Sequence, residues 1–259
     1  MLLRFAEERS AEHPSAEASR EFARIIGRES GGELLVRIYD EGRLGNEEMV
    51  AEQLRFGGID LARLQVRTLE SFSPAAARLG VPGRFPTEVS MAEAMGGEEG
   101  AALAEELQEE RLILLAWYDG GPDCRLLPRF REGESFSGLR IGVDPSRSAM
   151  AFVAASGGTP VPFALRDYRR AHEADLVDGF YLPLLSAASE RLLDSLKAFP
   201  ARDSRSLELV VASRSTFMQL LPTDRDVILR AAADSAELQV DFRFLAEKRV
   251  IESLRGGTK

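Results

Sequence analysis

The side chains of this chain best suited to hold a ligand are arginines. All but three of its 33 basic residues are arginines, whose planar guanidinium groups can bind a carboxylate through two parallel hydrogen bonds. A short strand is predicted at 139–143, and Asp144-Pro145-Ser146 after it predicts the start of a helix. Open α/β sheets bind ligands where a strand ends at a helix N-terminus. We therefore expect a ligand site beside Gly142, the last residue on the polar face of that strand.

The composition limits the classes of partner. The chain has 259 residues, of which 44% are hydrophobic and 29% charged, and this suits two α/β lobes better than one small core. Its net charge of −9 argues against nucleic acid and anionic membrane surfaces, whereas a local cluster of arginines still allows a small anion. A single cysteine, Cys124, and two separated histidines give no pattern for a disulfide or a metal site. We expect no metal and no cofactor.

Motifs that mark common enzyme classes are missing from the sequence. It contains no Gly-x-Ser-x-Gly elbow, no phosphate-binding loop and no Gly-x-Gly-x-x-Gly fingerprint. Two isolated histidines offer little general acid–base chemistry. We therefore expect no catalytic residues and a protein that is not an enzyme.

Strand and helix signals alternate along the chain and predict an α/β fold. Strands are predicted at 2–6, 33–39, 59–66, 112–117, 139–143, near 161, at 177–182 and at 207–212, with helices between most of them. Ser15, Asn46 and Thr223 are predicted helix N-caps. The helix that begins at Thr223 continues to about Leu254, long enough to bridge two lobes.

These elements predict a two-lobed clamshell with mainly parallel sheets and a ligand cleft between the lobes. The turn-rich stretch 118–123 predicts the crossover between them. We place residues 1–119 and 205–240 in lobe I, and residues 120–204 and 241–259 in lobe II.

Short motifs along nearly the whole chain resemble those of one family of transport receptors. In order they are His13-Pro14, Ser30-Gly31-Gly32, Gly42-Arg43-Leu44-Gly45, Gly57-Gly58-Ile59-Asp60, Pro74 ahead of Leu79-Gly80-Val81-Pro82, Gly138-Leu139-Arg140-Ile141, Gly157 with Pro160, Val177-Asp178-Gly179 and Leu221-Pro222. The ordered series resembles the dicarboxylate-type solute-binding proteins of tripartite ATP-independent periplasmic (TRAP) transporters. The resemblance implies a periplasmic binding protein clamshell, without catalysis, that closes on a small organic anion and delivers it to the permease subunits in the membrane.

The resemblance also implies where such a protein works. We expect a periplasmic or otherwise extracytoplasmic location, a leader peptide removed from the sequence, and a monomer. Family members usually continue beyond the long helix, so the chain looks short at its C-terminus.

The resemblance breaks down at the expected ligand site. It implies a clamping arginine at the position of Gly142 and a second arginine near Arg125, which fits if the turn absorbs about two residues. One interpretation is that Arg125, Arg140 or Arg147 replaces the missing clamp. The other is that the ligand is bulkier or more apolar than a dicarboxylate. In that case it would lie beside Gly142, Phe163, Phe180 and Tyr181.

Four further side chains are candidate ligand contacts because of their places near strand ends or before the first helix: Trp117, Tyr118, Gln65 and His13. The missing arginine also motivates a hypothesis from another class. On that hypothesis the same clamshell is a ligand-less or sensory interaction module, and a partner protein binds one of its outer faces.

Overall fold

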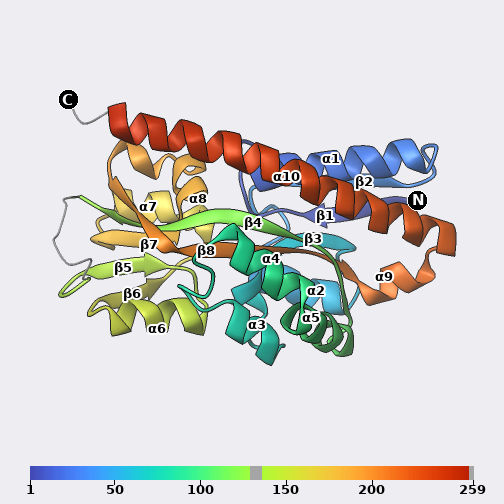
Figure 1. Cartoon of the computed structure of the whole chain (residues 1–259), viewed down its shortest axis with the longest axis horizontal. Coiled ribbons are helices and arrows are strands. Elements are labelled where there is room, and N and C mark those ends of the chain that lie inside the picture. The colour runs from blue at the N-terminus through green and yellow to red at the C-terminus, as the bar shows by residue number, and fades with distance from the viewer. Residues whose placement is uncertain (129–135, 257–259) are drawn as a thin grey trace.

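One continuous sheet runs through the molecule (Figure 1). The computed structural model describes residues 1–128 and 136–256, and these form eight strands in the order β2-β1-β3-β8-β4-β7-β5-β6. Helices cover both faces of the sheet. No helix of the described residues is long and apolar enough to cross a membrane, and no group of His, Cys, Asp or Glu within them could hold a metal ion.

Lobe I contains the end of the sheet formed by β2, β1 and β3. In it β1 (Leu2–Ala6) pairs in parallel with β2 (Leu35–Tyr39) and β3 (Leu61–Gln65). The helices of this lobe are α1 (Pro14–Glu29), α2 (Glu47–Arg55), the short turn η1 (Val66–Leu69), α3 (Pro74–Leu79), α4 (Glu88–Gly96), α5 (Glu98–Glu109) and α9 (Arg214–Gln219). Phe22 and Ile26 of α1 pack in one apolar cluster with Leu3 and Phe5 of β1.

Lobe II contains the opposite end of the sheet. There β5 (Arg140–Val143) pairs in parallel with β6 (Thr159–Pro162) and β7 (Gly179–Pro183). Its helices are α6 (Arg147–Ala155), the turn η2 (Leu165–Asp167), α7 (Tyr168–Glu173), α8 (Leu184–Ser189) and the turn η3 (Leu192–Asp194). Parallel strands within each lobe place their carboxyl ends at the junction of the two lobes.

Three long elements connect the lobes. The strands β4 (Leu112–Leu127) and β8 (Lys197–Ser213) run antiparallel to each other through both lobes, and the helix α10 (Pro222–Gly256) extends along the length of the molecule. At 1.5 Å per residue its 35 residues span roughly 50 Å. The antiparallel pairs β3–β8 and β4–β7 complete the sheet. The predicted two-lobed clamshell with a long bridging helix is therefore confirmed.

Several local predictions were wrong in detail. The stretch 118–123 is not a turn but the middle of β4, where the register shifts and Gly121 has φ +85°. Glycine and proline here mark β-bulges within a strand. His13, not Ser15, is the N-cap of α1, and α10 begins at Pro222 before Thr223. The boundaries placed at 119/120, 204/205 and 240/241 fall inside β4, β8 and α10, and they remain a proposal.

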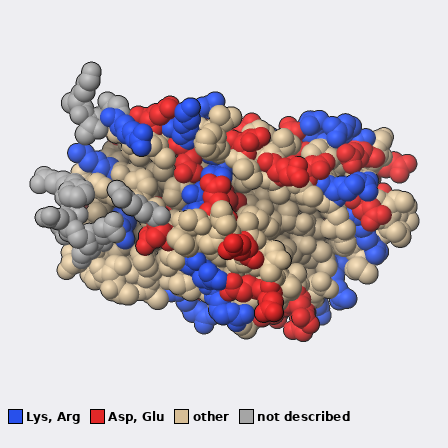
Figure 2. Space-filling view, viewed as in Figure 1, with Lys and Arg blue, Asp and Glu red and all other residues tan. Residues whose placement is uncertain are grey.

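Charges of both signs are interspersed on the surface. The face seen in Figure 2 carries basic and acidic side chains side by side along α10 and around the junction of the lobes. Such a surface supports solubility. This face shows no large patch of basic side chains alone that would suit an acidic partner.

Candidate ligand-binding site

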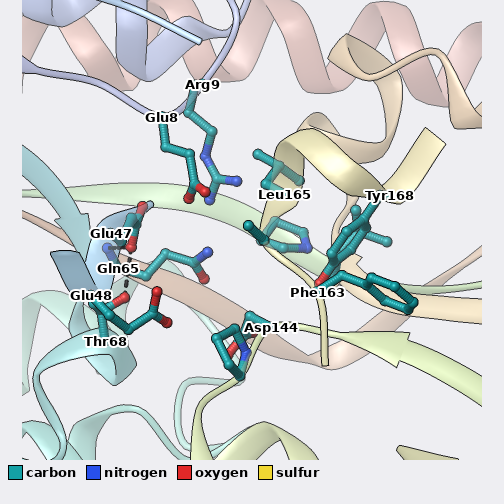
Figure 3. Close-up of a pocket in the computed structure, with 14 residues that line it drawn as sticks. Glu8, Arg9, Glu47, Glu48, Gln65, Thr68, Asp144, Phe163, Leu165 and Tyr168 are labelled. Carbon is teal, nitrogen blue, oxygen red and sulfur yellow. Dashed lines mark hydrogen bonds between the residues drawn. The ribbon is translucent and has the colours of Figure 1, made fainter. Parts of the chain in front are cut away.

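A small cavity lies where the carboxyl ends of the parallel strands of both lobes meet (Figure 3). Lobe I lines it with Glu8, Arg9, Glu47, Glu48, Gln65 and Thr68, and lobe II with Asp144, Pro145, Phe163, Ala164, Leu165, Tyr168, Leu182 and Pro183. The cavity measures about 20 Å³, room for about one water molecule. A larger ligand therefore enters only when the lobes move apart, the hinge motion that a clamshell allows.

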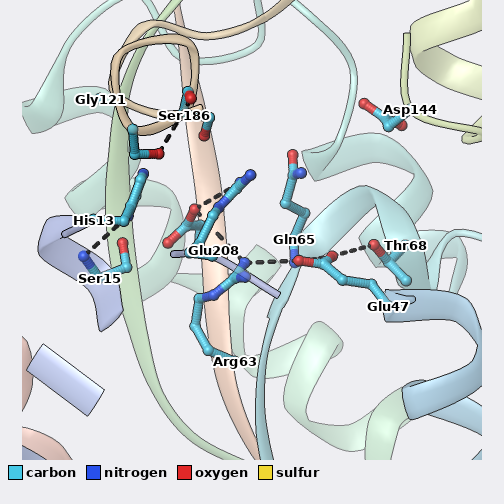
Figure 4. A network of polar contacts seen from close by, with 12 residues as sticks. His13, Ser15, Glu47, Arg63, Gln65, Thr68, Gly121, Asp144, Ser186 and Glu208 are labelled. Atoms are coloured by element: carbon cyan, nitrogen blue, oxygen red, sulfur yellow. Dashed lines mark hydrogen bonds and ion pairs between the residues drawn. The ribbon is translucent and has the colours of Figure 1, made fainter. Parts of the chain in front are cut away.

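Beneath the cavity lies a buried network of charges (Figure 4). Arg63 is fully buried and donates to Glu7 from Nη2 at 2.6 Å and to Glu47 from Nη1 at 2.8 Å. Burial alone would lower the pKa of Arg63, but Glu7, Glu208 and Glu47 raise it well above its usual value. Each of the three carboxylates therefore faces a buried cation.

Arg9 is the cationic side chain that lines the cavity. It follows β1, is fully buried, and donates from Nη2 to Oε1 of Glu208 at 3.1 Å. Its Nε and Nη1 have no hydrogen-bond partner among the described residues. Figure 3 shows the guanidinium pointing toward the cavity beside Glu8 and above Gln65. A buried donor without a partner carries the full cost of its desolvation, so a ligand acceptor at this place is strongly favoured.

Two carboxyl groups of the cavity, those of Glu8 and Glu48, form no ion pair among the described residues. Both residues are half-buried. Burial and the charge of Glu47 raise the pKa of Glu8 to about 8, although the charges of Arg9 and Arg63 act to lower it. Burial also raises the pKa of Glu48. In contrast, Arg63 partners the carboxylate of Glu47, which also accepts from Thr68.

Arg67 connects the lobes below the cavity. It lies in η1 of lobe I, and its Nε is 3.3 Å from Oδ2 of Asp144 in lobe II and 3.0 Å from Oε1 of Gln65. Its Nη2 is also 3.6 Å from Asp123 of β4. Asp144 and Asp123 raise its pKa despite burial, which alone would lower it. The charge of Arg67 is therefore already balanced by two carboxylates in this structure.

A second contact between the lobes closes the cleft from the side of α6. The carboxylate of Glu70, just after η1, accepts from the backbone N–H groups of Arg147 and Ser148 in the first turn of α6. An anion at a helix N-terminus is stabilised by the unpaired N–H groups and by the helix dipole. A lobe I side chain therefore holds a lobe II helix in the closed arrangement.

Two aromatic rings, those of Phe163 and Tyr168, line the lobe II side of the cavity, and Phe180 packs against Tyr168. The ring of Phe180 stacks on Tyr168 with centroids 5.0 Å apart and lies directly over Gly142, its partner across the β5–β7 pair. A Cβ placed on Gly142 would be only 2.4 Å from Cδ1 of Phe180. The space that a side chain at 142 would need is therefore occupied by the Phe180 ring.

Comparison with known proteins identifies the family. Residues 5–257 match the model of the bacterial extracellular solute-binding proteins, family 7, also called DctP. The chain belongs to this family. This DctP-family chain is 25% identical over 232 residues to a solute-binding protein of Chromohalobacter salexigens, covering 88% of the chain and 68% of that relative. It is 22% identical to the 2,3-diketo-L-gulonate-binding periplasmic protein YiaO of Escherichia coli, covering 98% of the chain and 78% of that relative.

Solved structures of the same type share the fold of this DctP-family protein. A TRAP periplasmic solute-binding protein from Bradyrhizobium sp., in complex with galacturonate, superimposes with a TM-score of 0.90 at 25% identity, covering 100% of this chain and 87% of that one. The sugar acid binding protein DctPAm from Advenella mimigardefordensis, in complex with galactonate, gives a TM-score of 0.93 at 22% identity, with 99% and 84% covered. The chain is thus an extracytoplasmic solute-binding protein of the TRAP type.

Only two of the predicted ligand residues line the cavity of this DctP-family protein, namely Gln65 and Phe163. Arg140 lies outside it, on the surface, where its guanidinium pairs with Asp178. The Arg147 side chain is 75% exposed, and only its backbone N–H takes part in the contact between the lobes. Arg125 lies on β4 opposite Tyr181, with its guanidinium 5.7 Å from the ring centroid of Phe136.

The remaining candidates are buried in the protein or belong to another hollow. Phe180 fills the space at Gly142, and Tyr181 donates to Asp123. Tyr118 contacts Ser235 of α10, and Trp117 lines a separate groove of about 500 Å³ beside α10. His13 is fully buried, and its Nδ1 accepts from the backbone N–H of Ser15. Burial and Arg9 lower its pKa to about 3.

The polar residues of the site that the sequence interpretation missed are mainly Glu8, Arg9, Glu48 and Asp144. A signal for the first two was present. Glu7-Glu8-Arg9 directly follow the strand Leu2–Ala6, and ligand residues are expected after the carboxyl ends of parallel strands. The same rule that drew attention to Gly142 in lobe II therefore also applies to Arg9 in lobe I.

Proposed function

We propose that this protein captures a carboxylate-bearing organic solute between its two lobes, with Arg9 as the carboxylate anchor, and delivers it to TRAP permease subunits. The observation that supports this role is the fully buried Arg9 guanidinium, which lines the cavity and keeps Nε and Nη1 without a partner among the described residues. Charge-assisted hydrogen bonds to such a group contribute about 1.5–3 kcal/mol each.

Arg9 takes over a role that position 142 cannot fill. The family resemblance places the clamping arginine on β5, but Gly142 has no side chain and Phe180 covers it. Arg9 approaches the same junction from lobe I. In this proposal the carboxylate therefore binds to lobe I first, and lobe II then closes its aromatic wall over the rest of the solute.

We propose binding without chemistry, by a monomer. The family consists of binding proteins, and this agrees with the missing enzyme motifs. The check is recovery of the bound solute unchanged after long incubation, by mass spectrometry. Light scattering of the purified protein tests the monomer.

The binding experiment uses calorimetry and thermal unfolding with the acids found in related structures: D-galacturonate, D-glucuronate, D-galactonate and D-erythronate. Succinate represents the simple dicarboxylates. A solute present at 100 times its Kd stabilises the folded state by about 2.7 kcal/mol, which raises Tm by several degrees in a protein of this size. We expect such a rise with at least one carboxylate.

The variant Arg9→Lys tests the anchor. It keeps the positive charge next to Glu208 but removes the planar guanidinium donors, so we expect at least tenfold weaker binding with little change in stability. Arg140→Gln is the matched control, because that arginine is exposed and paired with Asp178, and it should bind as the wild type does. Equal affinity in wild type and Arg9→Lys would contradict the role of Arg9. No binding of any carboxylate would contradict the proposed function itself.

A further inference from the structure

The ionisable side chains that line the cavity are mostly acidic. Its lining carries four carboxylates, Glu8, Glu47, Glu48 and Asp144, against one arginine, Arg9. A site built only for an organic anion would show the opposite balance, because a ligand carboxylate is repelled by each unpaired carboxylate near it. This excess of acidic groups needs an explanation beyond the binding of a carboxylate.

Two of the four carboxylates are explained by partners beneath the cavity. Glu47 is paired with Arg63 at 2.8 Å, and Asp144 with Arg67 at 3.3 Å. Glu8 and Glu48 remain, and neither forms an ion pair with a cationic side chain in the described part of the chain. Burial, Glu47 and Glu48 raise the pKa of Glu8 by more than the charges of Arg9 and Arg63 lower it.

The side chains without an ion pair and the cation with free donors line the same small cavity. Glu8 and Arg9 are consecutive residues after β1, and Figure 3 shows both side chains pointing toward the cavity above Gln65. Glu48 lies in the first turn of α2 on the same side of the cleft. The Arg9 donors thus offer one place for an acceptor, and Glu8 and Glu48 offer a neighbouring place for a cationic donor.

We infer that the solute is zwitterionic, with a protonated amine close to its carboxylate, and that Glu8 and Glu48 bind the amine while Arg9 binds the carboxylate. This inference rests on the proposed function and narrows it to amino-substituted acids. An ammonium group in this position favours the ionised form of both glutamates, including Glu8, whose pKa of about 8 otherwise keeps it mostly protonated at neutral pH. A buried carboxylate is stabilised when it is paired and hydrogen-bonded. Phe163 and Tyr168 then cover the carbon skeleton from lobe II.

The test compares acids that differ only at C2, where one member of each pair has a hydroxyl group and the other an ammonium group. Suitable pairs are D-gluconate with 2-amino-2-deoxy-D-gluconate, glycerate with serine, and lactate with alanine. Calorimetry with the wild-type protein should show at least tenfold tighter binding of the amino member in the pair whose size fits the cleft.

Isosteric variants connect this preference to the two glutamates. Glu8→Gln and Glu48→Gln should each reduce the preference for the amino acid by about tenfold, while binding of the hydroxy acid stays the same or improves. Glu52→Gln, on the same helix with its side chain 51% exposed, is the matched control and should leave the preference unchanged. Circular dichroism confirms that each variant is folded.

The outcomes separate this inference from the proposed function. If a hydroxy acid or a uronate binds and no amino acid of the panel binds more tightly, the inference is wrong and the receptor for organic acids stands. A preference for the amino member that neither glutamate variant changes also overturns the assignment of Glu8 and Glu48. If no carboxylate of either kind binds, the proposed function fails, and this inference fails with it.

Discussion

Position 142 has room for hydrogen only, and this single residue decides how the site is interpreted. A Cβ there would lie 2.4 Å from Cδ1 and 2.5 Å from Cε1 of Phe180. Overpacking of this kind typically costs about 1–3 kcal/mol. We expect Gly142→Ala to lower the free energy of unfolding by about that amount, measured by urea denaturation.

A double-mutant cycle locates the cause. Phe180→Leu should cost less in the Gly142→Ala background than in the wild type, because the smaller side chain makes room for the new methyl group. Gly96→Ala is the control, since a Cβ at that glycine of α4 meets nothing within 4 Å. Additive effects of the two changes would show that Phe180 is not what excludes a side chain at 142.

A buried histidine makes stability depend on pH. His13 has a pKa of about 3 in the folded protein against an ordinary value of 6.5, chiefly through burial. A lowered pKa contributes stability above the unfolded value, and this stability is lost as the pH falls from 6.5 toward 3, by about 1.4 kcal/mol per unit. Asn also caps helices but does not titrate in this range.

We therefore expect the wild type to lose about 2 kcal/mol more than His13→Asn between pH 7 and pH 5, measured by urea denaturation at both values. This window lies above the range in which Glu208 titrates, since Arg63 and Arg9 overcome burial and hold its pKa at about 2. Parallel pH profiles of the two proteins would contradict the assignment to His13.

At the scale of elements, the contact between Glu70 and the first turn of α6 stabilises the closed arrangement of the lobes. Glu70→Ala removes a cap that reaches across the cleft to the N–H groups of Arg147 and Ser148, so it weakens the closed arrangement by about 0.5–2 kcal/mol. We expect a larger radius of gyration by X-ray scattering in the absence of solute. Glu106→Ala is the matched control, because Glu106 caps α3 within lobe I. An unchanged radius of gyration in Glu70→Ala, or an equal increase in both variants, would contradict this role of Glu70.

The elements also show what the sequence can predict. Helix caps such as Asn46, and the order of strands and helices, follow from local patterns, and the structure confirms them. The structure of the stretch 118–123 does not follow from its local pattern. The pairing of β4 with β8 overrides the turn propensity of its glycines and proline. The place of Arg9 after a strand end was visible in the sequence, but its burial was not. Its ion pair with Glu208 joins residues 199 positions apart, and such a contact leaves no local pattern.

At the scale of the whole molecule, a cluster of charged side chains joins the three elements that connect the lobes, β4, β8 and α10. Asp119 of β4 is bound by Arg205 of β8 at 2.9 Å and lies 3.5 Å from Arg243 of α10. Removing one partner of a buried ion pair typically costs about 3–5 kcal/mol. We expect Asp119→Asn to lose that much stability in urea denaturation.

The control for this prediction lies in the same cluster. Glu88 contacts both arginines, but its side chain is 53% exposed, so Glu88→Gln should cost less than about 1 kcal/mol. If both variants lose equally little, the cluster does not join the lobes. Because β4, β8 and α10 each pass through both lobes, the wild type should unfold in a single transition.

The contact between Phe180 and Gly142 also limits the order in which this pocket can change during evolution. An arginine at 142 beside an intact Phe180 has no place to pack, so position 180 must become smaller before position 142 can become larger. The reverse path requires that the arginine be lost before the ring appears. Relatives of this protein should therefore vary at the two positions together, and a relative with arginine at one and phenylalanine at the other should be rare.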